Sequence, residues 1–341
     1  MTYILGVDGG NTKTIALVAR RDGTIVGAGR GGCGDIYGRA GPSGAIAEIE
    51  RAVLGALTAA GTHAGDLEAG AFSLAGADWP EDFALFEGEL RRLGFWRVIT
   101  VVNDALGALW AGAPAGAAVS VVCGTGIAIG ARGDAGRLWH GSFWLEPLGA
   151  SELGRRLMRA VLRAELGIDP PTTLTARVLG FYGREHVEQV LHAFTARGAP
   201  PANMGGLARL LLDEADRGDP TARRIALEHG LALGDYALVG ARQVGIVDVP
   251  FTMVLAGGVL RHPAGLLAET LTERVRAAAP NVQVVDSRFE PGVGALFGTG
   301  AGRRVDRCAA AGTVDTDSAA GRVLRHVVGR RRTLPHLGCA V

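Results

Sequence analysis

The sequence has little of what defines several protein classes. Cysteine occurs four times in 341 residues, and no two cysteines form the CxxC spacing of a metal or redox site. The formal net charge is +1 at pH 7, so the charge balance gives no argument for a surface that binds nucleic acid or a membrane. No apolar run is long enough to cross a bilayer, and the N-terminus enters an apolar run without a basic segment or cleavage site. We therefore expect a cytoplasmic globular protein without a signal peptide and without nucleic-acid or membrane partners.

The two most familiar phosphate-binding motifs are also missing. A P-loop has glycine directly before its Lys-Ser/Thr pair, whereas Thr12 precedes Lys13-Thr14 here. The dinucleotide fingerprint needs a third glycine that Gly124-Thr125-Gly126 does not have. Any phosphate site in this chain must therefore be built differently.

The most informative stretch lies near the N-terminus. Residues 3–7 form an apolar run that ends in Asp8 and two glycines, and a second apolar run covers 14–19. This pattern predicts two antiparallel strands joined by a tight polar turn, whose N–H groups form a nest for phosphate oxygens, with Asp8 placed to hold a hydrated Mg²⁺. An ordinary hairpin turn is the alternative. The candidate phosphate ligands are Gly9, Gly10, Asn11, Thr12, Lys13 and Thr14.

The order of apolar runs and turns predicts an α/β protein with a repeated architecture. Three strand-like runs are followed by crossover strands and helices, and the same strand–glycine turn–strand pattern restarts after a Gly/Ala/Pro linker. We expect an N-terminal domain over 1–112, completed by a closing helix at about 290–303. A C-terminal domain covers 113–289 and carries a helical insertion at about 151–240, and 304–341 form a tail.

Further polar and glycine segments follow predicted strands. Gly124-Thr125-Gly126 opens the second half, Gly257-Gly258 follows a late strand, and Asn103-Asp104 ends the strand before the linker. We expect the two glycine turns to face each other across a cleft and clamp a triphosphate, and the later glycine pair to let an adenosine moiety lie against the backbone. We expect Asp104 to take the proton from a substrate hydroxyl that attacks the γ-phosphate. Its alternative role is to cap the following helix.

These motifs resemble those of the acetate and sugar kinase/Hsp70/actin superfamily, and within it the N-acetylglucosamine kinase-like BadF/BadG/BcrA/BcrD ATPases. The resemblance implies two actin-like (ribonuclease H-like) domains, each a mixed sheet flanked by helices, with an ATP cleft between them. It implies Mg²⁺ near Asp8, phosphate contacts from Thr12 and Thr125, and Asp104 as general base. Relatives are often dimers, so a homodimer is compatible with it. The resemblance rests on segments 6–14, 103–105, 123–126, 255–259 and 291–295.

The segment that holds the sugar in amino-sugar kinases departs from the family pattern. Trp144 and Gly149 match, but Ala150 stands where the family has a sugar-binding Asp, and Ser151-Glu152 replace a Glu-Gly pair. The early substrate loop, which contains Asp35, lacks the family's Asn. The substrate-binding candidates are Asp35, Asn103, Trp144 and Glu152. For Trp144 the alternative is a core aromatic, and for Asp35 a solvated loop.

The sequence thus predicts an ATP-dependent kinase that acts on a hydroxyl of a small molecule, a sugar or amino sugar. Two other functions stay open. One is an ATPase activator of a reductase or dehydratase, which in the wider group uses a cluster bridged by cysteines. The other is a non-catalytic nucleotide or sugar sensor, which the altered sugar segment favours and which the presence of Asp8 and Asp104 argues against.

Overall fold

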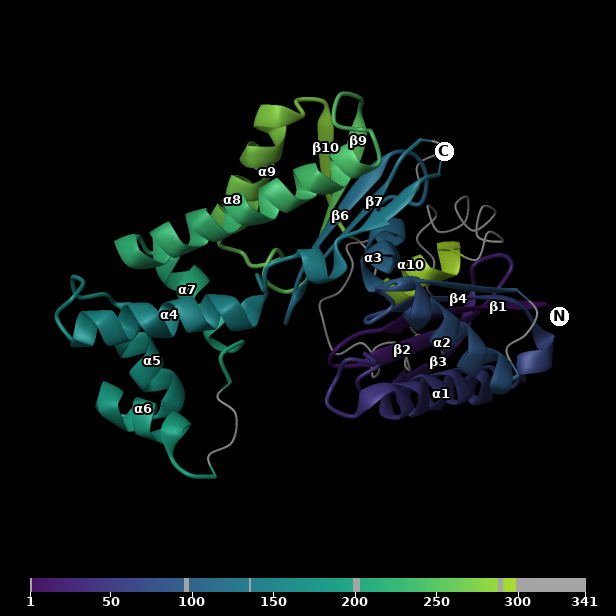
Figure 1. Ribbon diagram of the computed structural model, residues 1–341, viewed down its shortest axis with the longest axis horizontal. Coiled ribbons are helices and arrows are strands. Elements are labelled where there is room, and N and C mark those ends of the chain that lie inside the picture. The colour runs from purple at the N-terminus through teal and green to yellow at the C-terminus, as the bar shows by residue number, and fades with distance from the viewer. Residues whose placement is uncertain (1, 95–97, 135, 199–202, 288–290, 299–341) are drawn as a thin grey trace, which may run out of the picture. The chain divides into compact units, whose positions relative to one another are not determined.

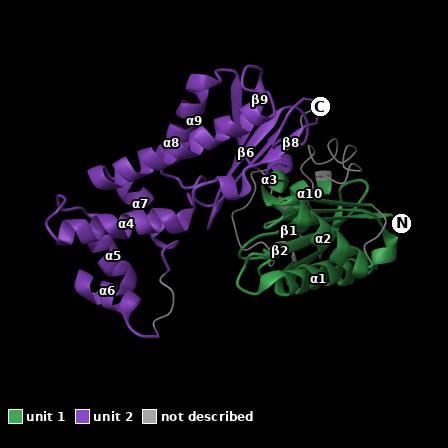
Figure 2. Cartoon of the chain, in the orientation of Figure 1, with its two compact units in different colours: residues 1–107, 291–341 green, residues 108–290 purple. Residues whose placement is uncertain are grey.

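The chain divides into two compact units. The computed structural model describes residues 2–94, 98–134, 136–198, 203–287 and 291–298. Unit 1 contains Met1–Gly107 and the segment that begins at Pro291, and unit 2 contains Ala108–Glu290 (Figure 2). The predicted tail at 304–341 and the end of the predicted closing helix lie outside the described residues.

Unit 1 is built on a five-stranded mixed sheet with the order β3-β2-β1-β4-β5. β1, β2 and β3 are antiparallel neighbours, whereas β4 and β5 extend the sheet in parallel with β1. The N-terminal apolar runs therefore form the predicted hairpins. The strands are β1 (Tyr3–Gly9), β2 (Thr14–Arg20), β3 (Ile25–Gly31), β4 (Leu67–Leu74) and β5 (Ile99–Asn103).

Helices cover this sheet, and α1 packs unusually close to β3 (Figure 1). A Cβ atom on Gly27, Gly29 or Gly31 would lie 2.0–2.2 Å from a carbonyl oxygen of α1, so only glycine permits this contact. The helices of unit 1 are α1 (Gly41–Ala60), the 3₁₀ helix η1 (Ala64–Asp66), α2 (Pro80–Arg92), α10 (Pro291–Gly298) and the start of α3 (Asp104–Gly112).

Unit 2 repeats the topology of unit 1. Its sheet has the order β10-β9-β6-β7-β8, in which β6, β7 and β8 are antiparallel and β9 and β10 run parallel to β6. The internal duplication expected from the sequence is confirmed at the level of strand order. The strands are β6 (Ala118–Cys123), β7 (Ile127–Arg132), β8 (Leu138–His140), β9 (Phe251–Ala256) and β10 (Val282–Asp286).

The helices of unit 2 fill the predicted insertion and cover its sheet. α8 packs against β6 and β7, and α9 packs against α8 (Figure 1). One apolar core joins this sheet to α4, α7, α8 and α9. The helices are the 3₁₀ helix η2 (Ser142–Trp144), α4 (Ala150–Glu165), α5 (Leu174–Tyr182), α6 (Val187–Thr195), α7 (Leu207–Asp216), α8 (Pro220–Gln243) and α9 (Leu266–Ala278).

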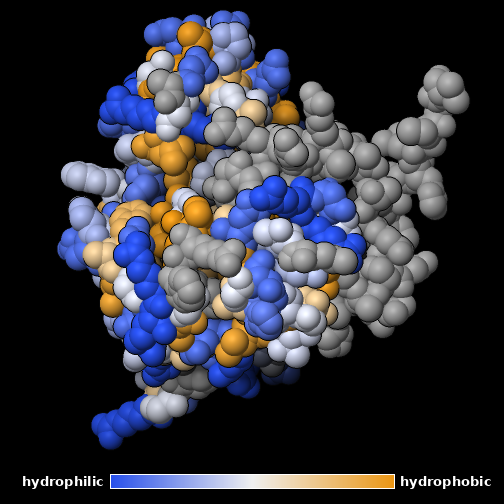
Figure 3. Space-filling model, turned by 90° about the vertical axis from the view of Figure 1, so that its right-hand side faces the viewer, coloured by the Kyte–Doolittle hydropathy of each residue, from blue (hydrophilic) through white to orange (hydrophobic). Residues whose placement is uncertain are grey.

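Two mixed sheets flanked by helices confirm the predicted fold class. The predicted elements differ from the observed ones mainly at their ends: the strand expected at 71–74 begins at Leu67, and the helix expected from 263 begins at Leu266. Among the described residues, no helix is both long and apolar enough to span a bilayer. Hydrophilic and hydrophobic patches alternate over the described part of the face in Figure 3.

Candidate active site

The carboxyl ends of three parallel strands meet at one edge of the sheet in unit 1. Asp8 of β1 pairs with Ser73 of β4, and Ser73 pairs with Val102 of β5. The residues that follow these strands therefore leave the sheet at the same level, where open α/β sheets bind their ligands. This register brings the turn after Asp8 and the Asn103-Asp104 pair to one edge.

The turn between β1 and β2 is held in place by backbone hydrogen bonds. Within it, the Gly10 N–H donates to the Lys13 carbonyl (3.0 Å). From outside, the Ala75 N–H donates to the Gly9 carbonyl (2.7 Å), and the Gly34 N–H donates to the Gly10 carbonyl (3.0 Å). The predicted tight hairpin is confirmed, and its contacts with phosphate stay a prediction.

The side chains of this turn differ in what they offer a ligand. Asn11 and Thr12 are exposed, so a ligand has access to both. Thr14 is fully buried, and its hydroxyl donates to the Gly32 carbonyl (2.9 Å), which ties β2 to the end of β3. In this structure the Thr14 side chain therefore has a packing role.

Asp104 is the first residue of α3 and is partly buried. Burial, followed by the negative charges of Asp78 and Asp35, raises the pKa of its carboxyl from 3.8 to about 7. A general base works best when its pKa lies near the working pH. At neutral pH a substantial fraction of Asp104 is therefore ionised and still basic enough to accept a proton.

Asp35 and Asp78 form an acidic cluster with Asp104. Burial raises the pKa of Asp35, and the charges of Asp78 and Asp82 add to the effect. Gly76 adopts φ +79°, and a Cβ atom there would lie 2.7 Å from Asp35 Oδ1, so glycine lets the two loops meet. Asp78 is not among the site residues predicted from the sequence, although it follows a predicted strand just as Asp8 and Asp104 do.

Asp82 fixes one side of this cluster. Its carboxylate accepts hydrogen bonds from the Trp79 N–H (2.8 Å) and from the Tyr37 hydroxyl (3.0 Å), which joins the Asp35 loop to the start of α2. Burial and this carboxylate raise the pKa of Tyr37 to about 12. Tyr37 therefore stays a neutral donor at physiological pH.

Two buried side chains connect β4 and β5 to the start of α3. The Asn103 amide nitrogen donates to Asp78 Oδ1 (2.8 Å), and its oxygen accepts the Ala105 N–H (3.1 Å). The Ser73 hydroxyl lies 3.3 Å from the Asp104 carbonyl oxygen and accepts the Gly107 N–H (3.1 Å). Asn103, predicted to bind substrate, thus caps α3 and positions Asp78 in this structure.

In unit 2, three predicted ligand-binding segments meet at the end of β6. Gly124-Thr125-Gly126 forms the turn to β7, with Thr125 and Gly126 exposed. Gly257 adopts φ +92°, and a Cβ atom there would lie 2.2 Å from the Cys123 carbonyl oxygen. Gly149 approaches the turn as closely, because its Cβ atom would lie 2.2 Å from the Thr125 carbonyl oxygen. The structure thus brings Gly257 and the predicted sugar segment against the Gly124–Gly126 turn.

The substrate-binding candidates of unit 2 lie in and after this sugar segment. Trp144 in η2 is 77% exposed, which excludes the core-aromatic alternative and leaves its indole accessible to a ligand. Glu152, in the first turn of α4, is paired with Arg155 (3.0 Å). Their contacts with a sugar stay predictions.

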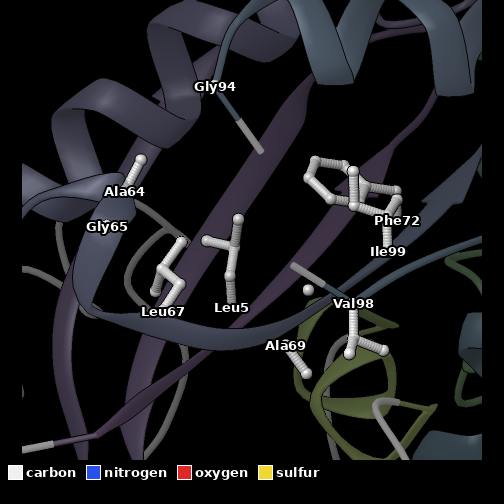
Figure 4. Close-up of a pocket in the computed structure, with 10 residues that line it drawn as sticks. Leu5, Ala64, Gly65, Leu67, Ala69, Phe72, Gly94, Val98 and Ile99 are labelled. Carbon is white, nitrogen blue, oxygen red and sulfur yellow. The ribbon is translucent and has the colours of Figure 1, made fainter. Parts of the chain in front are cut away.

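Three further features of the described residues bear on the candidate sites. Cys123 is buried and its thiol donates to the Leu148 carbonyl (3.3 Å), and burial raises its pKa to about 12. In the described ranges, no three or more His, Cys, Asp or Glu side chains are arranged so that they could hold a metal ion. An apolar pocket in unit 1 contains none of the predicted site residues (Figure 4); its lining includes Leu5, Leu67, Phe72, Val98 and Ile99.

Comparison with known proteins agrees with the resemblance found in the sequence. A family model described as the BadF/BadG/BcrA/BcrD ATPase family matches residues 5–298. An N-acetylmuramic acid/N-acetylglucosamine kinase from Clostridium acetobutylicum is 23% identical over 305 residues, which cover 87% of this chain and 98% of that protein. An N-acetyl-D-glucosamine kinase from Dictyostelium discoideum is 24% identical over 307 residues, covering 86% and 96%.

A solved structure extends the comparison to three dimensions. A candidate N-acetylglucosamine kinase from Chromobacterium violaceum superposes with a TM-score of 0.65 at 25% identity, covering 87% of this chain and 98% of that one. Because the match covers 87% of this chain, the likeness extends over most of both units.

Proposed function

This chain belongs to the BadF/BadG/BcrA/BcrD ATPase family, and we propose that it is an ATP-dependent kinase for a hydroxyl of a sugar or amino sugar. The relatives that match almost end to end are kinases of this kind. The observation in the structure that carries the proposal is Asp104, a carboxylate at the strand edge of unit 1 with a pKa of about 7.

Asp104 is the proposed general base. Kinases of this chemistry need a group that accepts the proton of the acceptor hydroxyl as it attacks the γ-phosphate. Burial and the neighbouring carboxylates keep the pKa of Asp104 near neutrality, so the ionised form has a driving force for proton uptake. The Ser73 and Asn103 hydrogen bonds hold the start of α3, and with it the Asp104 backbone.

The phosphates of ATP are proposed to bind backbone amides and hydroxyls of two turns. Those turns are Gly9–Thr14, in which Thr12 is exposed, and Gly124–Gly126, in which Thr125 is exposed. Gly257 and Gly258 are proposed to accommodate the adenosine moiety. Mg²⁺ usually binds through one or two carboxylates together with phosphates and water, and Asp8 at the end of β1 fits that mode. Bound Mg²⁺ would neutralise charge on the transferring phosphoryl group.

The acceptor is proposed to contact Asp35 and Trp144, with Glu152 and Asn103 as further candidates. Asp35 lies beside the proposed base, because its charge acts on the pKa of Asp104. Trp144 presents an exposed indole, and an aromatic face is a common platform for a sugar ring. We also propose that the protein is a homodimer and is located in the cytoplasm. Light scattering after gel filtration measures the mass of the oligomer.

The decisive experiment measures Mg²⁺-dependent ATP consumption across a panel of sugars and amino sugars. Wild type is compared with Asp104→Asn, and Asp22→Asn, in the exposed turn between β2 and β3, serves as the matched control. We expect turnover with one acceptor, a loss of at least about 100-fold in Asp104→Asn, and an unchanged rate in Asp22→Asn. ATP binding without turnover on any acceptor would instead favour a sensor or an activator.

A further inference from the structure

A fully buried histidine in unit 2 contacts the segment that supports the Gly124–Gly126 turn. His229 lies on α8, which runs over β6 and β7 (Figure 1), and its Nε2 is 2.7 Å from the Leu148 carbonyl oxygen. Burial lowers the pKa of His229 to about 4, so the ring is neutral at physiological pH. A carbonyl oxygen only accepts, so Nε2 carries the proton and donates.

The Leu148 carbonyl belongs to the segment that packs against the predicted phosphate-binding turn, Gly124–Gly126. The next residue, Gly149, touches the Thr125 carbonyl so closely that no side chain fits between them. The Ala150 N–H donates to the Gly124 carbonyl (2.8 Å). A continuous chain of contacts thus runs from His229 through residues 148–150 to the turn.

A histidine is a costly residue to place here if it only fills space. In the part of the chain that the structure describes, His229 Nδ1 is buried without a hydrogen-bond partner. Burying an unpaired polar nitrogen is unfavourable, and leucine would fill a similar volume without that cost. What histidine adds is the directed N–H that fixes the Leu148 carbonyl.

We propose that His229 is a positioning residue for the phosphate-binding turn, holding residues 148–150 so that Gly149 and Ala150 fix the backbone of Gly124–Gly126. The assignment of this turn to the phosphates of ATP rests on the proposed function. The Cys123 thiol donates to the same carbonyl (3.3 Å) from the end of β6, but as the weaker of the two donors. His229 therefore carries the principal contact from α8.

The test compares three variants with wild type. His229→Leu removes the donor and keeps the bulk, whereas His229→Gln places an amide nitrogen at the equivalent of Nε2 and restores it. Leu233→Ala is the matched control, because Leu233 is fully buried on the same helix one turn further on and has no donor. Kinetics give KM for ATP and KM for the acceptor, and hydrogen–deuterium exchange reports on peptides covering 123–127 and 148–153.

We expect His229→Leu to raise KM for ATP about tenfold, to leave KM for the acceptor within about twofold, and to speed exchange in both peptides. His229→Gln should recover most of the loss. Leu233→Ala leaves a cavity and should lower the free energy of unfolding, but it should leave KM for ATP unchanged and speed exchange in these two peptides no more than in the rest of unit 2. The proposal would be overturned if His229→Leu and wild type had the same KM for ATP and the same exchange rates in the two peptides. It would also be overturned if Leu233→Ala raised KM for ATP and speeded exchange in these peptides as much as His229→Leu does. If wild type phosphorylates no acceptor, the proposed function fails, and exchange alone decides the role of His229.

Discussion

Asp78 offers a direct test of how the acidic cluster controls the proposed base. Replacing Asp78 with asparagine removes one negative charge beside Asp104 but keeps an oxygen that can accept the Asn103 amide hydrogen bond. The charge of Asp78 is, after burial, the largest cause of the raised pKa of Asp104. In Asp78→Asn the pKa of Asp104 should therefore fall, and the acid limb of the rate profile should move to lower pH.

The size of the expected fall in the pKa of Asp104 can be estimated from the causes that raise this pKa. The pKa of Asp104 rises from 3.8 to about 7, which corresponds to about 4 kcal/mol against the charged form. Burial contributes most and is unchanged by the substitution, so we expect the pKa to fall by about one unit. At pH 6 the ionised fraction then rises from about a tenth to about a half, whereas at pH 8 it hardly changes. The variant should thus gain activity at pH 6 relative to pH 8.

The assay is kcat/KM for the acceptor between pH 5 and 9 at saturating ATP, about two pH units either side of the expected midpoint. ATP and the acceptor are the same in every protein, so their own titrations cancel in the difference between profiles. Asp22→Asn removes an exposed carboxylate from the β2–β3 turn and should leave the midpoint in place. An unmoved acid limb in Asp78→Asn, or one displaced to higher pH, would refute the electrostatic reasoning.

Two further predictions concern buried polar groups. Ser73→Ala removes the acceptor of the Gly107 N–H, so it should lower the free energy of unfolding by about 1–3 kcal/mol in urea denaturation. In steady-state kinetics it should lower kcat while changing KM for ATP little. His229 has a folded pKa of about 4, below its unfolded value of 6.5, so its neutral form stabilises the fold above pH 6.5 and that contribution fades as the pH falls towards 4. Wild type should therefore lose about 3 kcal/mol relative to His229→Gln between pH 7 and pH 4, and parallel pH profiles of the two proteins would contradict this.

The fold was largely predictable because its determinants are local. Apolar runs, polar turns and a composition change mark the strands, and their repetition in two halves predicts the shared order of the two sheets. The strand ends were less predictable: β4 begins at Leu67, where an acidic residue and a glycine interrupt the apolar pattern. Burial against neighbouring strands overrides that local signal.

The candidate site was predictable only where its residues adjoin a glycine turn or a strand end. Asp8 and Asp104 are marked in that way, and Asp78 could have been found by the same rule. His229 gives no such signal, because its partner Leu148 lies 81 residues away and the contact exists only once α8 packs on the sheet. Asn103 was predicted to bind substrate because it precedes Asp104. In the structure its side-chain amide instead forms hydrogen bonds with Asp78 and with the Ala105 N–H, and no sequence spacing indicates these partners.

A shared turn explains how one topology supports two kinds of chemistry. Across the end of β4 the chain reads Leu74-Ala75-Gly76-Ala77-Asp78, and across the end of β9 it reads Leu255-Ala256-Gly257-Gly258-Val259. In both segments the central glycine has a positive φ, +79° at Gly76 and +92° at Gly257, which a side chain there would disfavour. Unit 1 has Asp78 at the end of its turn, which raises the pKa of the proposed base. Unit 2 has valine there, and that side chain is only 7% exposed and packs in the apolar core of the unit, so this turn contributes packing in place of charge. Val259→Asp would place a charge in this core and should therefore lower the free energy of unfolding more than Val259→Asn, which is polar but uncharged, as measured by urea denaturation.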